Sequence, residues 1–239
     1  MSEIDPMSIA VCTPTYDGKL EVSYTAGLTL LAAHRRMAMP FFLAYCSNVA
    51  QARNRCVHWF LHKTDYQHLV FIDADIGFGL HDWDMLMEGD EECVCAEYRK
   101  KDQTRKVRVL YGLGFARISR AVLEGLAAMR SVDEEHDMLL RFRMEGEEWI
   151  DYFPQGVVTG DTWRGEDHGF WLMVQLAGFA VRIERRTHLM HTGVAHFPYE
   201  ANEFPDELSP YADPEGENDR LPDPVEALGA WAVPAIDLT

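Results

Sequence analysis

The stretch His68-Leu69-Val70-Phe71-Ile72-Asp73-Ala74-Asp75 decides the fold. Residues 69–72 are apolar without interruption, which is the pattern of a parallel β-strand covered on both faces. The run ends directly in two aspartates, Asp73 and Asp75. We therefore predict a buried strand that delivers two carboxylates into a loop at its carboxyl end.

The residues before this stretch repeat the alternation of strand and helix. Residues 9–12 are a short apolar run closed by turn formers at residues 13–18, which predicts a strand and then a loop. Residues 24–36 have helical apolar spacing, residues 41–45 predict a second strand, and Ser47 or Asn48 can cap a helix that runs to Leu61. This order predicts an α/β fold: a Rossmann-like, doubly wound, mainly parallel sheet with helices on both faces. Ligands of such sheets bind beyond the carboxyl ends of the strands.

The second half of the chain is less regular. Residues 107–118 form an extended stretch broken by Gly112 and Gly114, and a helix is expected from Ser119 through Met129. The alternation in residues 140–144 predicts a half-buried strand. Residues 166–176 predict a helix that ends at Gly178, and residues 179–183 predict another strand.

Composition places the chain among ordinary globular proteins. It has 239 residues, of which 47% are hydrophobic, enough for a sizeable core. Its apolar runs are shorter than the roughly 20 residues of a membrane-spanning helix, and its N-terminus lacks the basic and apolar regions of a signal peptide. We expect a cytoplasmic protein without a membrane span. Five cysteines, an odd number without C-x-x-C spacing, predict reduced buried thiols.

The net charge of -17 is distributed unevenly. Residues 200–239 hold eleven acids against one base and are rich in proline, so we predict one domain over residues 1–199 and an acidic, proline-rich extension over residues 200–239. A basic run interrupts the acidic background. It is either a solvated loop or a patch that meets an anionic substrate or acceptor. Its members are Arg99, Lys100, Lys101, Arg105, Lys106 and Arg108.

The two aspartates after the apolar strand suit a divalent cation. Asp73 and Asp75 offer hard oxygen ligands, which Mg²⁺ and Mn²⁺ prefer. A solvated turn is the alternative, but Ile76 and Phe78 keep the region partly buried, and unpaired buried carboxylates are costly. His191 can add a neutral imidazole as a further ligand, although a lone histidine is more often an ordinary polar residue.

Two further groups of charged residues have open interpretations. Glu166 and Asp167 begin a predicted helix, where its dipole favours carboxylates. They are either ordinary first-turn acids or contain a general base for an acceptor hydroxyl. Arg53 and Arg55, which flank Asn54, either bind a diphosphate or base or form salt bridges on a helix surface.

Taken together, these residues resemble the GT-A glycosyltransferases, in particular a compact bacterial and phage-type group. The matching segments follow the family's order over about residues 8–200, so the match is to an arrangement of motifs. They are Cys12-Thr13-Pro14-Thr15-Tyr16, Ala52-Arg53-Asn54-Arg55, Leu69-Val70-Phe71-Ile72-Asp73-Ala74-Asp75-Ile76-Gly77-Phe78, Gly112-Leu113-Gly114-Phe115-Ala116-Arg117-Ile118, Gly165-Glu166-Asp167-His168-Gly169-Phe170 and His191-Thr192-Gly193.

The resemblance implies a role for each matching position. The nucleotide-sugar would be bound by Thr13, Pro14, Thr15, Tyr16, Arg53, Asp73 and Ala74. Asp75 and His191 would hold the metal, with Asp73 touching the sugar or ribose or joining the metal shell. Asp167 is the expected general base, with Glu166 beside it facing the acceptor. The chain departs from the family in a shorter, more basic stretch over residues 98–112 and in His168, where an aromatic residue is common.

The expected reaction follows from these roles. A glycosyl group would move from a nucleoside diphosphate sugar, with uridine as the expected nucleoside, to a hydroxyl acceptor with the help of Mn²⁺ or Mg²⁺. If Asp167 deprotonates the acceptor opposite the leaving group, the anomeric centre inverts; a retaining course stays open. The acceptor is a hydroxymethylated pyrimidine in DNA, with the basic run on phosphates, or a glycan or lipid-linked molecule. The net charge of -17 argues against general DNA affinity.

Two other classes of protein share part of this pattern. A nucleotidyltransferase would have the same sheet, metal and carboxylates, but would carry a glycine-rich phosphate loop where residues 13–18 stand. A non-catalytic nucleotide-binding module would keep Thr13, Arg53 and Asp75 and would have no use for Asp167.

Overall fold

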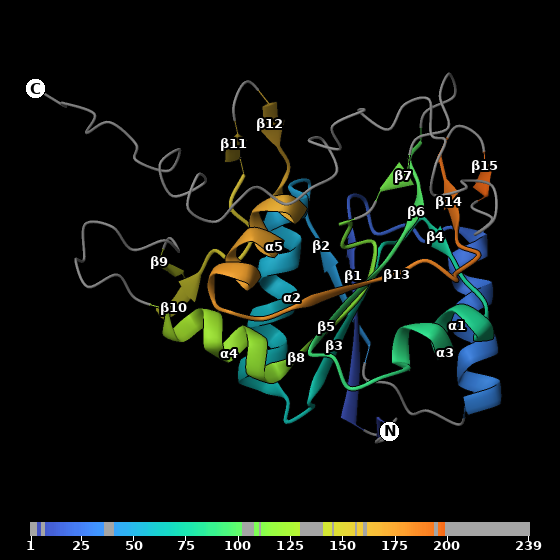
Figure 1. Ribbon diagram of the computed structural model, residues 1–239, viewed down its shortest axis with the longest axis horizontal. Coiled ribbons are helices and arrows are strands. Elements are labelled where there is room, and N and C mark those ends of the chain that lie inside the picture. The colour runs from blue at the N-terminus through green and yellow to red at the C-terminus, as the bar shows by residue number, and fades with distance from the viewer. Residues whose placement is uncertain are drawn as a thin grey trace, which may run out of the picture.

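A six-stranded sheet forms the centre of the computed structural model (Figure 1). The structure describes residues 4–5, 8–35, 41–101, 108–109, 111–129, 141–144, 146–155, 157–159, 162–193 and 196–198. The predicted acidic extension and the basic residues Arg105 and Lys106 lie outside these ranges. The division into one domain and an extension therefore stays a prediction.

The strands of the central sheet run mainly in one direction. Their order is β13 (Val181–Glu184), β5 (Cys93–Ala96), β8 (Phe115–Ser119), β3 (His68–Ile72), β1 (Ile9–Thr15) and β2 (Phe41–Tyr45). Only β8 is antiparallel to its neighbours β3 and β5, while the other pairs are parallel. The carboxyl ends of β1 and β3 thus meet at one edge of the sheet, as predicted.

Helices cover both faces of this sheet (Figure 1). On one face lie α1 (Val22–Arg35) and α3 (Leu80–Met87), and on the other lie α2 (Val49–Lys63), α4 (Arg120–Ala128) and α5 (Glu166–Leu176). The α/β fold with a mainly parallel sheet and helices on both faces is therefore confirmed.

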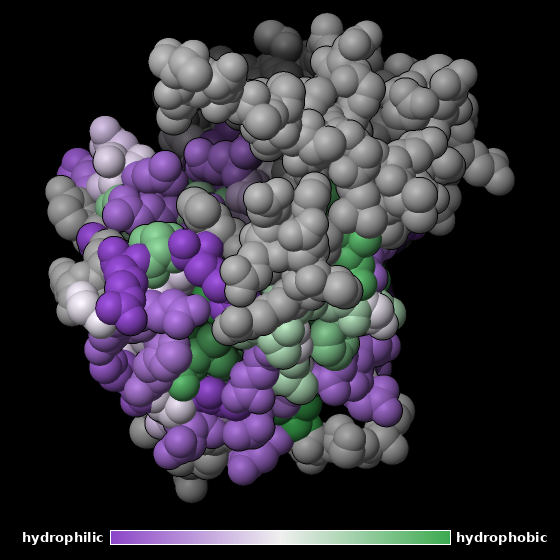
Figure 2. Space-filling model, turned by 90° about the vertical axis from the view of Figure 1, so that its left-hand side faces the viewer, coloured by the Kyte–Doolittle hydropathy of each residue, from purple (hydrophilic) through white to green (hydrophobic). Residues whose placement is uncertain are grey.

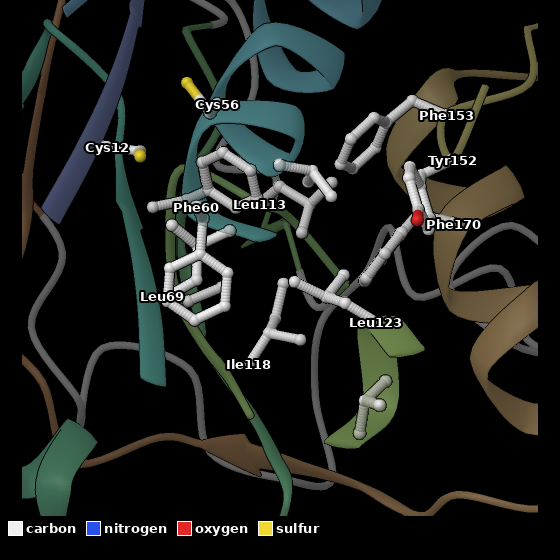
Figure 3. Close-up of a cluster of buried hydrophobic side chains, with 14 of the residues drawn as sticks. Cys12, Cys56, Phe60, Leu69, Leu113, Ile118, Leu123, Tyr152, Phe153 and Phe170 are labelled. Atoms are coloured by element: carbon white, nitrogen blue, oxygen red, sulfur yellow. The ribbon is translucent and has the colours of Figure 1, made fainter. Parts of the chain in front are cut away.

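Alternating side chains of the strands build two buried cores. Ile72 of β3 packs with Tyr24 and Trp83 from the helices of one face, and Phe71, its neighbour, packs with Phe60 and other residues on the opposite face. Successive residues of a strand point to opposite faces, and this fully apolar strand serves both cores. Figure 3 shows the second core, where side chains from α2, β3, β8, α4 and α5 meet.

Local sequence signals explain the helix ends. The side chain of Asn48 accepts a hydrogen bond from the backbone N–H of Gln51 at 3.1 Å, and the Ser119 hydroxyl accepts one from Val122 at 3.3 Å. Each satisfies a backbone donor that the first turn of a helix leaves open. Gly178 has a φ of 85°, the left-handed conformation that closes α5. The predicted helices are present, with ends that differ by two residues at most.

A two-stranded hairpin departs from expectation. It pairs β9 (Arg141–Met144) with β10 (Glu147–Ile150). The predicted half-buried strand exists, but Phe142 is 37% exposed, so the prediction that its side chain is buried is wrong. Within the described ranges, the ring of Phe142 lies against that of Trp149, with centroids 6.4 Å apart.

Short strands complete the structure around the edge where β1 and β3 end. A three-stranded sheet contains β4 (Ile76–Gly77), β14 (Met190–Thr192) and β15 (His196–Pro198). The two remaining pairs are β6 (Tyr98–Arg99) with β7 (Arg108–Val109), and β11 (Val157–Thr159) with β12 (Thr162–Arg164). Among the described residues, no helix combines the length and hydrophobicity needed to cross a membrane. The five cysteines are free thiols, and four of them are buried.

Candidate functional site

A single arginine joins three elements at the centre of the site. Arg53 of α2 is 3% exposed, and its Nη2 donates to both carboxylate oxygens of Asp73 at 3.1 Å. Its Nη1 donates to Oε1 of Glu166, in the first turn of α5. Asp73 follows β3 directly, so the guanidinium holds the end of the central strand against the start of α5. The observed role of Arg53 is this link between two carboxylates. Its contact with a nucleotide stays a prediction.

Burial and charge act in opposite directions on Asp73. Its surroundings raise the pKa of the carboxyl, because burial disfavours the charged form, while the neighbouring Arg53 lowers the pKa in part. The repulsion from Asp75 adds to the effect of burial. Without Arg53, the charge on Asp73 would lack its only hydrogen-bonding cation in the described part of the chain.

The pairing of β14 with β4 brings His191 beside the second aspartate. In this antiparallel register His191 lies opposite Ile76, and the backbone N–H of Thr192 donates to the carbonyl oxygen of Asp75 at 2.8 Å. The Nδ1 of His191 donates to the carbonyl oxygen of Arg99 at 2.8 Å, which leaves a lone pair on Nε2. Burial lowers the pKa of His191, so its imidazole is neutral at pH 7.

A carboxylate oxygen of Asp75 and the lone pair on Nε2 of His191 face one another. The Nε2 of His191 lies 3.6 Å from Oδ1 of Asp75, too far for a hydrogen bond. That oxygen is buried and has no hydrogen-bond partner within the described ranges. The second oxygen, Oδ2, forms an ion pair with the ammonium of Lys101. A carboxylate oxygen and an imidazole nitrogen that face each other in this way fit a divalent cation.

The described residues supply only part of a metal shell. None of them form a group of three or more His, Cys, Asp or Glu side chains placed to hold one ion. Magnesium-type sites are commonly built from one or two carboxylates together with phosphate oxygens and water. Asp75 and His191 therefore offer two ligands, and a cation bound there would need others from outside the described residues.

Asp167 is an ionised carboxylate beside this centre. Burial acts to raise its pKa, but hydrogen bonds from His168 and the charge of that ring lower it below the ordinary value of 3.8. Its Oδ1 accepts from the backbone N–H of His168 at 2.9 Å. The side chain is 24% exposed, so a substrate hydroxyl can reach it. The geometry allows it to accept a proton.

Thr13 and Thr15 stand at the carboxyl end of β1, and both hydroxyls have partners within the protein. Thr13 is fully buried and its hydroxyl lies 2.6 Å from the hydroxyl of Tyr24. The hydroxyl of Thr15 accepts from Gly18 at 3.1 Å and donates to the carbonyl oxygen of Lys19 at 3.2 Å. The hydroxyl of Thr13 thus joins β1 to α1, and the hydroxyl of Thr15 holds the loop that follows β1. Tyr16, 72% exposed, is the large aromatic side chain that this loop exposes.

Pro14 and Ala74, two other residues predicted to bind the nucleotide-sugar, have contacts within the protein. Pro14 lies buried in β1, opposite Ala44 of β2. The carbonyl oxygen of Ala74 accepts from the backbone N–H of Glu21 at 2.9 Å, which ties the loop after β3 to the start of α1. Among the predicted site residues as a whole, the structure forms two groups. Arg53, Asp73 and Glu166 make up one group, and Asp75 and His191 make up the other.

Tyr98 is a residue of the site that the sequence did not indicate. It is 6% exposed, and its ring meets that of His191 edge to face at 5.2 Å between centroids. A Cβ atom on Gly114 would lie 2.8 Å from its hydroxyl oxygen and 3.1 Å from Oδ2 of Asp73. The tyrosine fits only because Gly112 and Gly114 have no side chains. The spacing of these two glycines was the available signal.

Comparisons with known proteins find similarity only at the level of structure. No protein-family model and no curated protein matches the sequence. The structure of A197 from STIV is 16% identical with a TM-score of 0.48, and the match covers 77% of this chain and 85% of that one. A mutant Drosophila β1,4-galactosyltransferase 7, in complex with manganese, UDP-Gal and xylobiose, is 12% identical with a TM-score of 0.41, over 74% of this chain and 64% of that one.

A third similar structure is that of TarS from S. aureus in complex with UDP. It is 13% identical with a TM-score of 0.37, over 74% of this chain and 57% of that one. The chain thus spans less than two thirds of the length of the galactosyltransferase and TarS structures. Since the TM-scores do not exceed 0.48, we base the function on the geometry of the site.

Proposed function

We propose that this protein is a metal-dependent glycosyltransferase that moves a sugar from a nucleoside diphosphate sugar to a hydroxyl acceptor. The observation that carries the proposal is the unpartnered Oδ1 of Asp75, which faces the lone pair of His191 at 3.6 Å. This pair lies beyond the carboxyl end of β3, where ligands of α/β sheets bind. The arginine-linked carboxylates Asp73 and Glu166 lie beside it.

The first part of the proposal concerns the metal and the diphosphate. Asp75 and His191 would hold Mn²⁺ or Mg²⁺ together with diphosphate oxygens. When bound, such a cation neutralises the charge that develops on a leaving diphosphate. Lys101 already supplies a positive charge at Asp75, so its ammonium is placed to bind the same phosphates.

The second part concerns the rest of the donor. Tyr16 projects from the end of β1 and offers an exposed aromatic face on which a nucleobase can stack. Asp73 would orient the sugar or ribose, since Arg53 fixes its carboxylate in one position. We expect a uridine diphosphate sugar to be the donor.

The third part concerns the acceptor. Asp167 would accept the proton of the attacking hydroxyl while that oxygen bonds to the anomeric carbon. The bond from this carbon to the diphosphate oxygen breaks at the same time, and its electron pair leaves with the diphosphate. The lowered pKa keeps Asp167 ionised at neutral pH, as a general base requires. Attack opposite the leaving group inverts the anomeric centre.

The test is a panel of nucleotide sugars incubated with the protein and Mn²⁺ or with EDTA, followed by chromatography of the products. We expect free nucleoside diphosphate and sugar from one donor, loss of the reaction in EDTA, and loss in Asp75→Asn. Asp65→Asn is the matched control, because Asp65 is exposed in the turn before β3. Release of sugar 1-phosphate in place of the nucleoside diphosphate would instead indicate a nucleotidyltransferase, and binding without any product a nucleotide-binding module.

A further inference from the structure

A pocket of about 450 Å³ lies beside the first turns of α2. Because α2 begins just after β2, this pocket lies at the same edge of the sheet as Asp75. None of the roles described above uses it. Its lining residues are Asn48, Ala50, Gln51, Asn54, Phe142, Trp149, Asp151, Phe153 and Gln155.

One part of the lining is aromatic and held in place. The rings of Phe142 and Trp149 lie 6.4 Å apart at an interplanar angle of 28°. Trp149 in turn stacks on His58 of α2, with centroids 3.9 Å apart and an interplanar angle of 5°. Phe142 is 37% exposed although it is a large apolar side chain. The pocket therefore has a fixed aromatic surface that is open to a ligand.

Another part of the lining offers hydrogen bonds. Oδ1 of Asp151 accepts from Asn54 at 2.6 Å and from the backbone of Phe153 at 3.0 Å, and its Oδ2 has no partner within the described ranges. The amide oxygen of Asn48 is used by Gln51 and by Gln155, which leaves the amide nitrogen of Asn48 as a donor. Acceptors and donors thus surround the aromatic surface.

The mixture of these groups suits a sugar ring. A pyranose has apolar C–H faces that pack on aromatic rings, and hydroxyl groups around its rim that donate and accept hydrogen bonds. We propose that this pocket binds a neutral sugar residue of the acceptor, which makes the acceptor a glycan. The inference rests on the proposed function, since it assigns the acceptor of the same reaction.

Charge distinguishes a glycan from the nucleic-acid alternative. The nine lining residues include one carboxylate and no lysine or arginine. A DNA backbone needs cationic partners for its phosphates, and Asp151 would repel them. The net charge of the whole chain, -17, acts in the same direction. A neutral sugar carries no such penalty.

The pocket is connected to the reacting centre through two elements. Asn54 follows Arg53 on α2, so adjacent residues serve the pocket and the carboxylate pair. Phe153 stacks on Phe170 of α5 at 5.0 Å, and the first turn of α5 carries Asp167. Figure 2 shows the side of the molecule that carries β9 and β10, where hydrophobic surface is exposed between hydrophilic residues.

Calorimetric titration with neutral oligosaccharides of glucose, galactose, xylose or N-acetylglucosamine tests this inference. We expect one series to bind, and Phe142→Ala and Gln51→Ala each to weaken binding about tenfold. Leu30→Ala should leave binding unchanged, because Leu30 is an exposed apolar residue on α1, across the sheet. A hydroxymethylcytosine-containing DNA duplex should not bind. Binding of the duplex in place of every saccharide, or equal saccharide binding by Phe142→Ala and Leu30→Ala, overturns the inference.

Hydrolysis of the sugar nucleotide in water separates this inference from the proposed function. The wild-type protein should hydrolyse a donor when no saccharide is present, because water then takes the place of the acceptor hydroxyl. A protein that hydrolyses a donor but binds no saccharide contradicts the pocket assignment alone. A protein whose saccharide binding depends on Phe142, but which turns over no sugar nucleotide, contradicts the proposed function and leaves a saccharide-binding pocket.

Discussion

Arg53 lies between Asp73 and Glu166 and donates a hydrogen bond to each carboxylate from a different nitrogen of its guanidinium. The three side chains come from α2, from the end of β3 and from the start of α5, which are far apart in the sequence. The two acidic motifs of the site are thus linked by one buried cation. This relationship couples the stability of the fold to the geometry of the site.

Replacement of Arg53 should therefore affect stability. Arg53→Met leaves two mostly buried carboxylates without their cation, and removal of one partner from a buried ion pair costs about 3 kcal/mol. Urea denaturation measures the loss. Arg55→Met, the same change two residues along α2, is the control and should cost much less. Equal losses of unfolding free energy in the two variants would contradict a stabilising role of the Arg53 ion pairs.

Lys101 should compete with the metal. Its ammonium is paired with Oδ2 of Asp75, so Lys101→Met removes a cation that a metal would have to displace or tolerate. Since a partly exposed ion pair is worth up to about 1 kcal/mol, we expect Mn²⁺ to bind on the order of fivefold more tightly to the variant. Calorimetry without nucleotide measures this, with Lys100→Met as control. Weaker Mn²⁺ binding by Lys101→Met contradicts the prediction.

Gly114 should tolerate no side chain. A Cβ atom there would meet the Tyr98 hydroxyl at 2.8 Å and the Asp73 carboxylate at 3.1 Å, so Gly114→Ala should displace one of them. Because displacements near 1 Å lower enzyme rates by about a hundredfold, we expect donor hydrolysis to fall at least tenfold. Gly79→Ala is the control, since its nearest contact would be 3.6 Å away. Unchanged hydrolysis in Gly114→Ala would show that the reaction does not depend on the positions of Tyr98 and Asp73.

Acid should weaken the ion pairs of Glu184. Burial acts to raise the pKa of this carboxyl, but hydrogen bonds from Arg186 and Arg182 lower it below the ordinary value of 4.5, which it recovers on unfolding. The stabilisation that the ion pairs of Glu184 provide is therefore complete above pH 4.5 and is lost as the pH falls through the lower pKa of the folded state. Glu184→Gln should cost about 2 kcal/mol at pH 7 and progressively less as the pH falls below 4.5, by urea denaturation. A cost that does not depend on pH would exclude this account.

Much of the fold was predictable because its strands and helix ends carry strong local signals. The apolar run of β3, the cap at Asn48 and the glycine after α5 each act over a few residues, and the structure places them as predicted. The exposure of Phe142 was not predictable, since alternation alone does not reveal whether a second layer covers a hairpin.

In the candidate site, the positions of the residues along the chain were more predictable than their contacts. That Asp73 and Asp75 follow a buried strand is predictable from local sequence, and the structure places both in the short turn between β3 and β4. Arg53 as a link between two carboxylates, and Tyr98 against His191, depend on contacts between distant elements that no local pattern encodes. The hydrogen bond of Thr13 to Tyr24 depends on the packing of α1 on β1, and that of Thr15 to Gly18 depends on the geometry of the loop.

The central claim is that Asp75 and His191 hold the metal of a glycosyl-transfer site. Pulsed electron paramagnetic resonance of the full-length protein with Mn²⁺ and UDP tests it most directly. The account predicts one bound ion with a nitrogen coupling from a single imidazole, lost in His191→Gln, and loss of the bound ion in Asp75→Asn. A bound ion that shows the same nitrogen coupling in His191→Gln, or that persists in Asp75→Asn, would contradict the claim.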